Sequence, residues 1–92
     1  MKTERKDGQW VDVRSREEYD SGHIAGARLL PLDQLEQRAG EILPDKNAVW
    51  QVYCQSGFRS ELAAKQLQHM GYTQVINFGS IANWKGRLTT KE

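Results

Sequence analysis

Apolar and polar positions along the chain predict short strands that alternate with short helices. The strongest strand covers residues 48–53, AVWQVY, where apolar residues fall on both faces, as in a parallel strand that is covered on both sides. Weaker β-prone runs lie at residues 10–13, 27–30 and 75–78. Strands separated by helices favour an α/β fold, in which a small parallel sheet of about four strands is flanked by helices on both faces.

Three helices are predicted between these strands. Ser15, with Glu18 three residues later, forms a capping-box pattern that starts a short helix, and Gly22 ends it. The second helix has apolar residues at the spacing typical of a core-facing side: Leu32, Leu35, Ala39 and Ile42. A third helix is expected over residues 61–70, and one last helical turn over residues 81–85.

The length of 92 residues fits one small domain. Residues 1–9 are charged and aperiodic, so we expect a flexible arm there, a single domain over residues 10–88 and a flexible tail over residues 89–92. With 13 basic and 12 acidic residues, the chain lacks the positive excess that attracts nucleic acid. No run approaches the roughly 18 apolar residues of a membrane span. We therefore expect a monomer that binds neither nucleic acid nor membrane.

The start of the chain, MKTERKDGQ, is charged and contains no apolar segment of the kind found in signal peptides. As it stands, the sequence is typical of a cytoplasmic protein. A periplasmic location would require that a leader had been removed, so the compartment stays open.

Cys54 is the only cysteine, and it follows strand 48–53 directly, before a glycine-containing loop and a helix start. One thiol allows neither an internal disulfide nor a cysteine-rich metal site, and two histidines, His23 and His69, are too few to predict zinc. The N–H groups and dipole at a helix start stabilise an anion, which favours the nucleophilic thiolate. An inert buried cysteine is the alternative that this loop alone leaves open.

The rest of the loop fits the binding of an anionic sulfur. Its residues are Gln55, Ser56, Gly57, Phe58 and Arg59, followed by Ser60. Gly57 permits a tight curl, and Arg59 carries a fixed charge that can bind an oxyanion through two parallel hydrogen bonds. The serines add hydroxyl donors, and Phe58 is expected at the rim. We expect the main-chain N–H groups of residues 55–59 to point toward the sulfur of Cys54.

Four segments resemble the rhodanese family in order and spacing. WVDVRSREEYDSGHIAGA is similar to the family's D-V-R-x-x-x-E-[FY]-x-x-G-H-I-x-G-A segment, and VYCQSGFRS to its Y-C-x-x-G-x-R-S active loop. MGYTQV and GSIANWKG resemble the closing G-[FY]-x-x-V and G-G-x-x-x-W pieces. The resemblance covers residues 10–86 and is nearest to compact single-domain members of the phage shock protein E type.

The resemblance implies a rhodanese-like fold and a thiosulfate sulfurtransferase that needs no metal and no organic cofactor. Cys54 would take sulfane sulfur from thiosulfate or a related small anionic donor as a persulfide, and cyanide or a thiol would then remove it. The loop amides would stabilise the negative sulfur. Asp12 and Arg14, which share one face of the first strand, would brace the base of the loop.

We also make predictions for several individual positions. Gln55 stands where the family often has a cation, so the affinity for thiosulfate is open, and Ser80 replaces the second glycine of the closing pair. His23 is expected to make structural hydrogen bonds and His69 to be exposed. Trp84 is expected to pack against the core or its edge.

Two alternatives remain. Phosphatase-like and arsenate-reductase-like enzymes also use a cysteine and an arginine, but they resemble Cys-x5-Arg, whereas four residues separate Cys54 from Arg59. The smaller loop suits a single sulfur atom. The other alternative is a rhodanese-like module that relays sulfur to a protein acceptor with little turnover of its own, which cyanolysis would distinguish.

Overall fold

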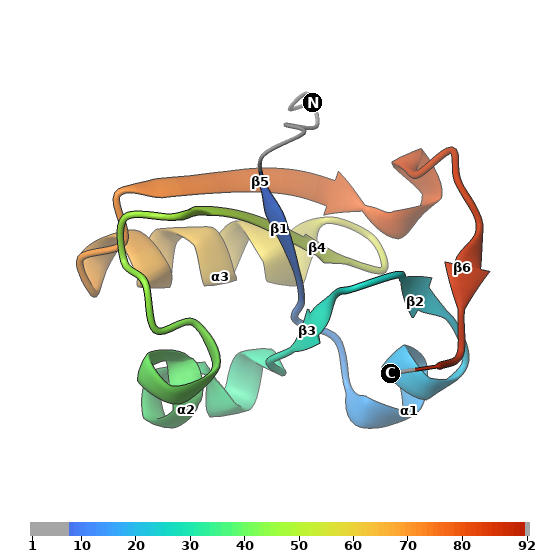
Figure 1. Cartoon of the computed structure of the whole chain (residues 1–92), viewed down its shortest axis with the longest axis horizontal. Coiled ribbons are helices and arrows are strands. Elements are labelled where there is room, and N and C mark those ends of the chain that lie inside the picture. Colours follow the sequence, from blue (N-terminus) through green and yellow to red (C-terminus); the bar gives the residue numbers. More distant parts are fainter. Residues whose placement is uncertain (1–7, 92) are drawn as a thin grey trace.

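The computed structural model describes residues 8–91, so residues 1–7 of the expected arm lie outside the described residues, and Gln9 already belongs to a strand. Four parallel strands form one sheet in the order β3-β1-β4-β5 (Figure 1). Their bounds are β1 (Gln9–Asp12), β3 (Arg28–Leu29), β4 (Val49–Cys54) and β5 (Gln74–Ser80). The predicted α/β class and the parallel sheet are confirmed.

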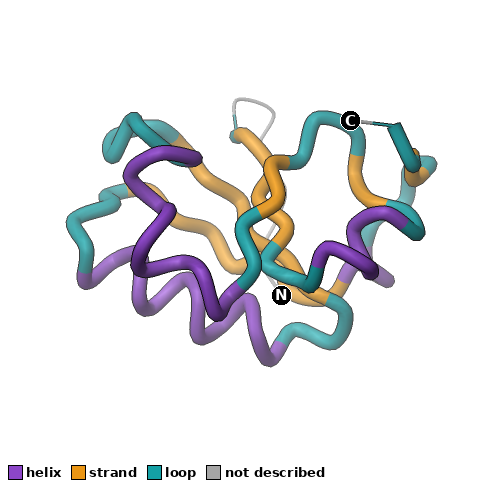
Figure 2. The backbone as a smooth tube through the Cα atoms, turned by 90° about the horizontal axis from the view of Figure 1, so that it is seen from below, coloured by secondary structure: helices purple, strands orange, loops and turns teal. Residues whose placement is uncertain are grey.

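Helices pack on both sides of the strands, with α2 and α3 together on one side and α1 on the other (Figure 2). Their bounds are α1 (Arg16–Asp20), α2 (Leu35–Ile42) and α3 (Phe58–His69), and two 3-10 turns are η1 (Leu32–Gln34) and η2 (Ile81–Asn83). The predicted capping box starts α1, because Ser15 and Glu18 bond reciprocally. Helix α3 begins three residues earlier than predicted, because Gly57 occupies its N-cap position in the left-handed conformation.

Alternation along β4 divides the core into two apolar clusters, one on each face of the sheet, and every residue of β4 is buried. The cluster beneath α2 and α3 contains, among others, Trp50, Val52, Cys54, Leu35 and Leu67. The opposite cluster contains Trp10, Tyr19, Ile24, Ala27, Tyr53, Phe78 and Ile81, with Trp84 packed against it as expected. This double burial is the property that the sequence pattern predicted for a central parallel strand.

The C-terminal segment is held against the second cluster by His23. Strand β6 (Leu88–Thr89) pairs antiparallel with β2 (His23–Ile24), so the domain boundary drawn at residue 88 falls inside a strand. The two ring nitrogens of His23 lie 2.8 Å from the Tyr19 carbonyl and 2.9 Å from the Lys91 carbonyl. His23 therefore has the structural hydrogen-bonding role predicted for it, and His69 is exposed as expected.

Replacing Trp10 with alanine should unfold a large share of the protein. Trp10 makes edge-to-face ring contacts with Tyr53, Phe78 and Trp84, and truncating a buried aromatic side chain costs about 3–5 kcal/mol. A domain of this size has a total stability of about 5 kcal/mol. Urea unfolding followed by circular dichroism measures the loss. Leu62→Ala, on the exposed side of α3, is the control and should cost less than about 1 kcal/mol. Equal midpoints for the two variants would contradict this description of the core.

Candidate functional site

Cys54 ends β4, and its sulfur accepts two main-chain hydrogen bonds from the start of α3. The Gly57 nitrogen lies 3.0 Å and the Ser60 nitrogen 3.3 Å from Cys54 Sγ. Gly57 is within the predicted set of residues 55–59, and Ser60 lies one position beyond it. Cys54 has no exposed area, yet these two N–H groups give the buried sulfur a polar environment at the positive end of a helix dipole.

The tight curl of the loop depends on the backbone conformation of Gly57. Its φ of 101° lies in the left-handed region, which side chains other than glycine rarely adopt. A Cβ built at this position would lie 3.7 Å from Gly79 Cα and from the Ser80 nitrogen, which is ordinary contact. Glycine is therefore required here by backbone conformation rather than by lack of space.

Strand β5 holds the loop from one side. A bulge shifts the β4–β5 register so that Tyr53 pairs with Gly79 and Cys54 with Ser80. The Ser80 hydroxyl then donates to the Gln55 carbonyl at 2.7 Å. Ser80, the departure from the family's second glycine, thus contacts the active loop directly.

Ser60 joins the start of α3 to the middle of β5. Its hydroxyl lies 3.0 Å from the Gly57 carbonyl and 2.7 Å from Asn77 Oδ1. Sequence reasoning missed Asn77, although a lone polar residue inside an apolar strand was a usable signal. Ser60 thus contacts the site in two ways. Its main-chain N–H donates to the sulfur of Cys54, and its side chain links the first turn of α3 to β5.

Asp12 and Arg14 form a buried pair at the end of β1, with Arg14 Nη2 2.8 Å from Asp12 Oδ2. The same nitrogen donates to the Gly22 carbonyl at 2.7 Å, and Arg14 Nη1 donates to Gln55 Oε1 at 3.3 Å. Burial acts to lower the pKa of Arg14, but the hydrogen bond and charge of Asp12 outweigh it, and the net shift is upward. Arg14 therefore stays charged and contacts the loop through the Gln55 side chain.

Arg59 is engaged by Glu18 rather than pointing as a free charge at the sulfur. Its two terminal nitrogens donate to the two Glu18 oxygens at 2.8 Å and 2.9 Å, each side chain being about one third exposed. The Arg59 hydrogen bond lowers the pKa of Glu18 to about 2. Sequence analysis expected Arg59 to bind an oxyanion in this way, and the structure shows that a carboxylate of α1 already occupies that geometry.

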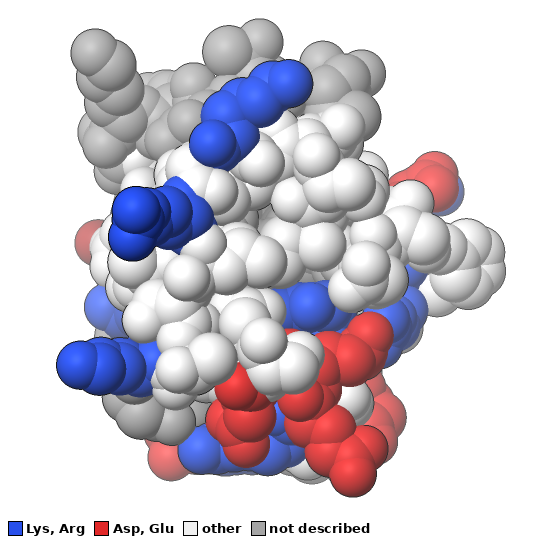
Figure 3. Space-filling view, turned by 90° about the vertical axis from the view of Figure 1, so that its right-hand side faces the viewer, with Lys and Arg blue, Asp and Glu red and all other residues white. Residues whose placement is uncertain are grey.

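The outer side of the loop is open. Gln55 and Ser56 are exposed, and the Phe58 side chain is 68% exposed, which is the rim position expected for it. Figure 3 looks onto the side of the molecule at which β4 and β5 end, and it shows acidic side chains gathered beside a few basic ones in the lower part of this face.

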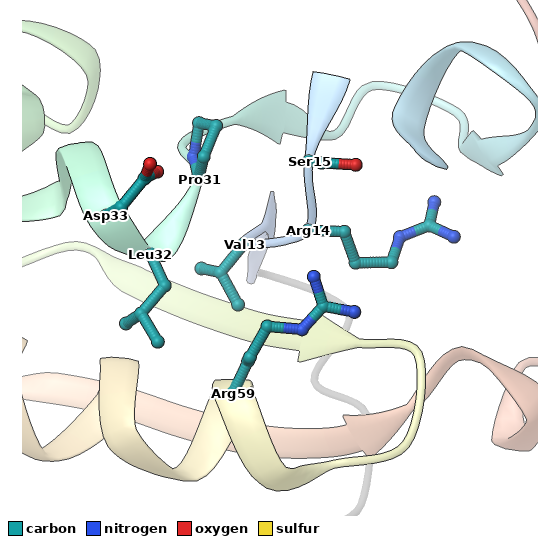
Figure 4. Close-up of a pocket in the computed structure, with 7 residues that line it drawn as sticks. All are labelled: Val13, Arg14, Ser15, Pro31, Leu32, Asp33 and Arg59. Atoms are coloured by element: carbon teal, nitrogen blue, oxygen red, sulfur yellow. The ribbon is translucent and has the colours of Figure 1, made fainter. Parts of the chain in front are cut away.

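A cavity of about 380 Å³ opens beside the loop (Figure 4). It is lined by Val13, Arg14, Ser15, Pro31, Leu32, Asp33 and Arg59, so Cys54 itself lies behind its wall. The sequence interpretation assigned Leu32 only to the core, and it did not place Pro31 or Asp33 near the site. The sequence pattern could not place these residues near the site, because η1 lies in the connection between β3 and α2 and meets the loop only through tertiary packing.

Residues 8–91 contain no group of three or more His, Cys, Asp or Glu side chains placed to hold a metal ion. Nor do they contain a helix long and apolar enough to cross a membrane.

Comparison with known proteins identifies relatives along most of the chain. The chain is 42% identical over 85 residues to the uncharacterized protein YqhL of Bacillus subtilis, covering 91% of this chain and 66% of that protein. It is 42% identical over 72 residues to the thiosulfate sulfurtransferase PspE of Escherichia coli, covering 78% of this chain and 69% of that protein. The chain thus spans about two thirds of the length of these relatives.

A solved structure of similar sequence supports the same relationship. A rhodanese with anions from E. coli superposes with a TM-score of 0.85 at 36% identity, covering 91% of this chain and 99% of that one. The human single-domain sulfurtransferase TSTD1 gives a TM-score of 0.76 at 28% identity, with coverages of 85% and 80%. The named relatives support sulfur transfer as the general activity. The rhodanese-like domain model matches residues 1–87, and the chain belongs to the rhodanese-like domain family.

Proposed function

We propose that this chain transfers sulfane sulfur from thiosulfate or a related anionic donor to cyanide or a thiol through a persulfide on Cys54. The observation that carries the proposal is the pair of N–H donors, Gly57 and Ser60, on Cys54 Sγ. Donors fixed around a sulfur favour its negatively charged forms, both thiolate and persulfide. Sulfurtransferase relatives such as PspE support the same activity.

The first half-reaction loads the enzyme. The Cys54 thiolate attacks the outer sulfur of thiosulfate, the bond between the two donor sulfurs breaks, and sulfite leaves with the electron pair. Cys54 then carries the persulfide Cys54–S–S⁻. The step starts from a thiolate and needs no general base, which agrees with the engagement of both His23 ring nitrogens in the fold.

The second half-reaction discharges the persulfide. Cyanide or a thiolate attacks the outer sulfur, thiocyanate or a new persulfide leaves, and Cys54 returns as the thiolate. Because Cys54 is the only cysteine of the sequence, no resolving thiol is available within it and the acceptor is an outside molecule. The N–H donors of α3 stabilise the regenerated Cys54 anion.

The pairing of Arg59 argues against phosphate chemistry. A Cys–Arg oxyanion enzyme needs its guanidinium free to hold a tetrahedral anion, but here both terminal nitrogens bond to Glu18. Their ion pair ties the first turn of α3 to α1 instead. In sulfur transfer, Arg59 thus serves to position the turn that carries the N–H donors.

A second candidate is sulfur relay to a protein acceptor, and one observation favours it. Phe58 and Leu62, one turn apart at the start of α3, are 68% and 42% exposed. Exposed apolar side chains beside a reactive loop suit contact with another protein. Rapid cyanolysis without any partner favours the enzyme, whereas capture of a persulfide that turns over only with a protein acceptor favours the relay.

Incubation with thiosulfate should add the mass of one sulfur atom to the intact protein. The added sulfur should be lost when cyanide is supplied, with one thiocyanate formed per sulfur lost, because the persulfide is the only intermediate. Whole-protein mass spectrometry and a thiocyanate assay measure both steps. Cys54→Ser, whose hydroxyl oxygen can accept hydrogen bonds but cannot form a persulfide, is the matched control and should show neither change. Folded wild-type protein that gains no sulfur from thiosulfate would refute thiosulfate as donor.

The ion pair between Glu18 and Arg59 should make a pH-dependent contribution to stability. Folding lowers the pKa of Glu18 from 4.5 to about 2. The ion pair therefore contributes its full stabilisation at pH values above the pKa of Glu18 in the unfolded chain. This stabilisation is lost as the pH falls through the pKa of Glu18 in the folded protein. Glu18→Gln retains a capping-box side chain and should cost up to about 1 kcal/mol near neutral pH, as expected for an ion pair whose side chains are about one third exposed.

Urea unfolding of wild type and Glu18→Gln, at neutral pH and near the folded pKa of Glu18, tests this. The difference in unfolding free energy should shrink toward zero in acid. Glu17→Gln, the exposed neighbour, is the control and should show little difference at either pH. A Glu18→Gln difference that stays constant into acid would contradict the assignment of the ion pair.

A further inference from the structure

We propose that the cavity beside the active loop binds the body of the sulfur acceptor and favours thiols that carry a positive charge. The inference rests on the proposed persulfide chemistry of Cys54, and it assigns the substrate class of the second half-reaction. It is carried by three observations: the position of the cavity against the loop, its apolar walls, and the pairing of its charges.

The cavity adjoins the active loop at two places, although Cys54 itself is not among its lining residues. Val13, in its wall, donates its main-chain N–H to the Tyr53 carbonyl at 3.1 Å, one residue before Cys54. Arg59, also in its wall, directly precedes Ser60, whose N–H donates to Cys54 Sγ at 3.3 Å. A molecule seated in this cavity therefore lies next to the loop on which the persulfide forms.

The walls offer apolar surface to an organic molecule. Val13, Pro31 and Leu32 contribute side chains to a cavity of about 380 Å³. Such a volume is within the range of sites for small molecules, and cyanide would leave most of it empty. Hydrocarbon carrying a thiol would gain from burial there, which raises the effective concentration of the thiol beside the sulfur.

Two arginines line the cavity, yet neither adds net charge to it. Arg14 is paired with Asp12 at 2.8 Å, and Arg59 is held by both oxygens of Glu18. Asp33 lies across the cavity from the two arginines (Figure 4). Within residues 8–91, its carboxylate makes no salt bridge or hydrogen bond.

The unbalanced charge at the cavity is therefore the negative charge of Asp33. Asp33 is exposed, and its carboxylate on the wall of this open cavity attracts an ammonium group and repels an anion. The dianionic donor is then directed to the N–H groups around the sulfur, while an aminothiol gains an ion pair with Asp33. This division keeps donor and acceptor from competing for one subsite.

The transfer step moves one sulfur atom from Cys54 to the acceptor thiol. The acceptor thiol loses its proton to solvent, and its thiolate attacks the outer sulfur of Cys54–S–S⁻. The S–S bond to Cys54 breaks, its electron pair returns to Cys54 as the thiolate, and the acceptor leaves as a persulfide. The neutral sulfur atom changes carrier, and no external oxidant or reductant is consumed.

The test measures discharge of persulfide-loaded protein by three small thiols of different charge. Protein is loaded with thiosulfate, desalted, and mixed with cysteamine, 2-mercaptoethanol or 3-mercaptopropionate, and the loss of one sulfur is followed by mass spectrometry. The comparison is the ratio of wild-type to variant rate for each thiol, so that the intrinsic reactivities of the thiols cancel. Asp33→Asn is the test variant, and Glu36→Gln, an exposed acid outside the cavity, is the matched control.

Asp33→Asn should slow cysteamine discharge up to about fivefold, the equivalent of a partly exposed ion pair, and leave 2-mercaptoethanol unchanged. Discharge by 3-mercaptopropionate should stay the same or become faster, and Glu36→Gln should change none of the three rates. Equal effects of Asp33→Asn on all three thiols, no effect on any, or the same effect in Glu36→Gln would overturn the acceptor subsite. Failure of the loading step would instead refute the proposed function, so the two failures are distinguishable.

Discussion

The rest of the site depends on two main-chain hydrogen bonds to the sulfur atom of Cys54. They exist because only the short loop of residues 55–57 separates Cys54 from α3, with Gly57 in a left-handed conformation at the helix N-cap. That start is held by the hydrogen bond of Ser60 to Asn77 of β5 and by the ion pair of Arg59 with Glu18 of α1, so two separate elements fix one helical turn. Displacement of this turn would leave a buried thiol in an apolar cluster, where its anion would be unfavourable.

The charges around the site are arranged in neutral pairs, and this arrangement has a chemical consequence. Arg14 with Asp12 and Arg59 with Glu18 support the loop without creating a strong general anion site. Preference for a negative sulfur then comes from N–H groups that point at that atom, which is a local and directional effect. The carboxylate of Asp33, on the neighbouring cavity, leaves that region open to a partner of the opposite charge.

The sequence predicted those features that depend on periodicity and local turn chemistry. Burial of both faces of β4, the capping box at Ser15 and the glycine at residue 57 follow from alternation, spacing and backbone preference, and the structure contains all three. The start of α3 was placed late because the loop contributes its own residues to the first turn. Strands β2 and β6 were missed because these two-residue strands do not lie in a longer β-prone run, whereas the equally short β3 lies within the predicted run 27–30.

The partners of the site residues were harder to predict than the residues themselves. That Arg59 would meet Glu18, or Ser60 meet Asn77, depends on how α1 and β5 pack against α3, and distances along the chain do not encode this. The cavity has the same origin, since η1 reaches the loop only through tertiary packing. The local position of a single residue was thus predictable, whereas the pairing that neutralises or exposes its charge required the fold.

Amide NMR spectra of the protein, recorded before and after thiosulfate treatment, show whether the N–H groups of Gly57 and Ser60 hold the reacting sulfur. The Gly57 and Ser60 amide signals should shift most on persulfide formation, and they should stay in place in Cys54→Ala. If the protein gains a sulfur by mass while these two signals remain unmoved, these N–H groups do not hold the sulfur.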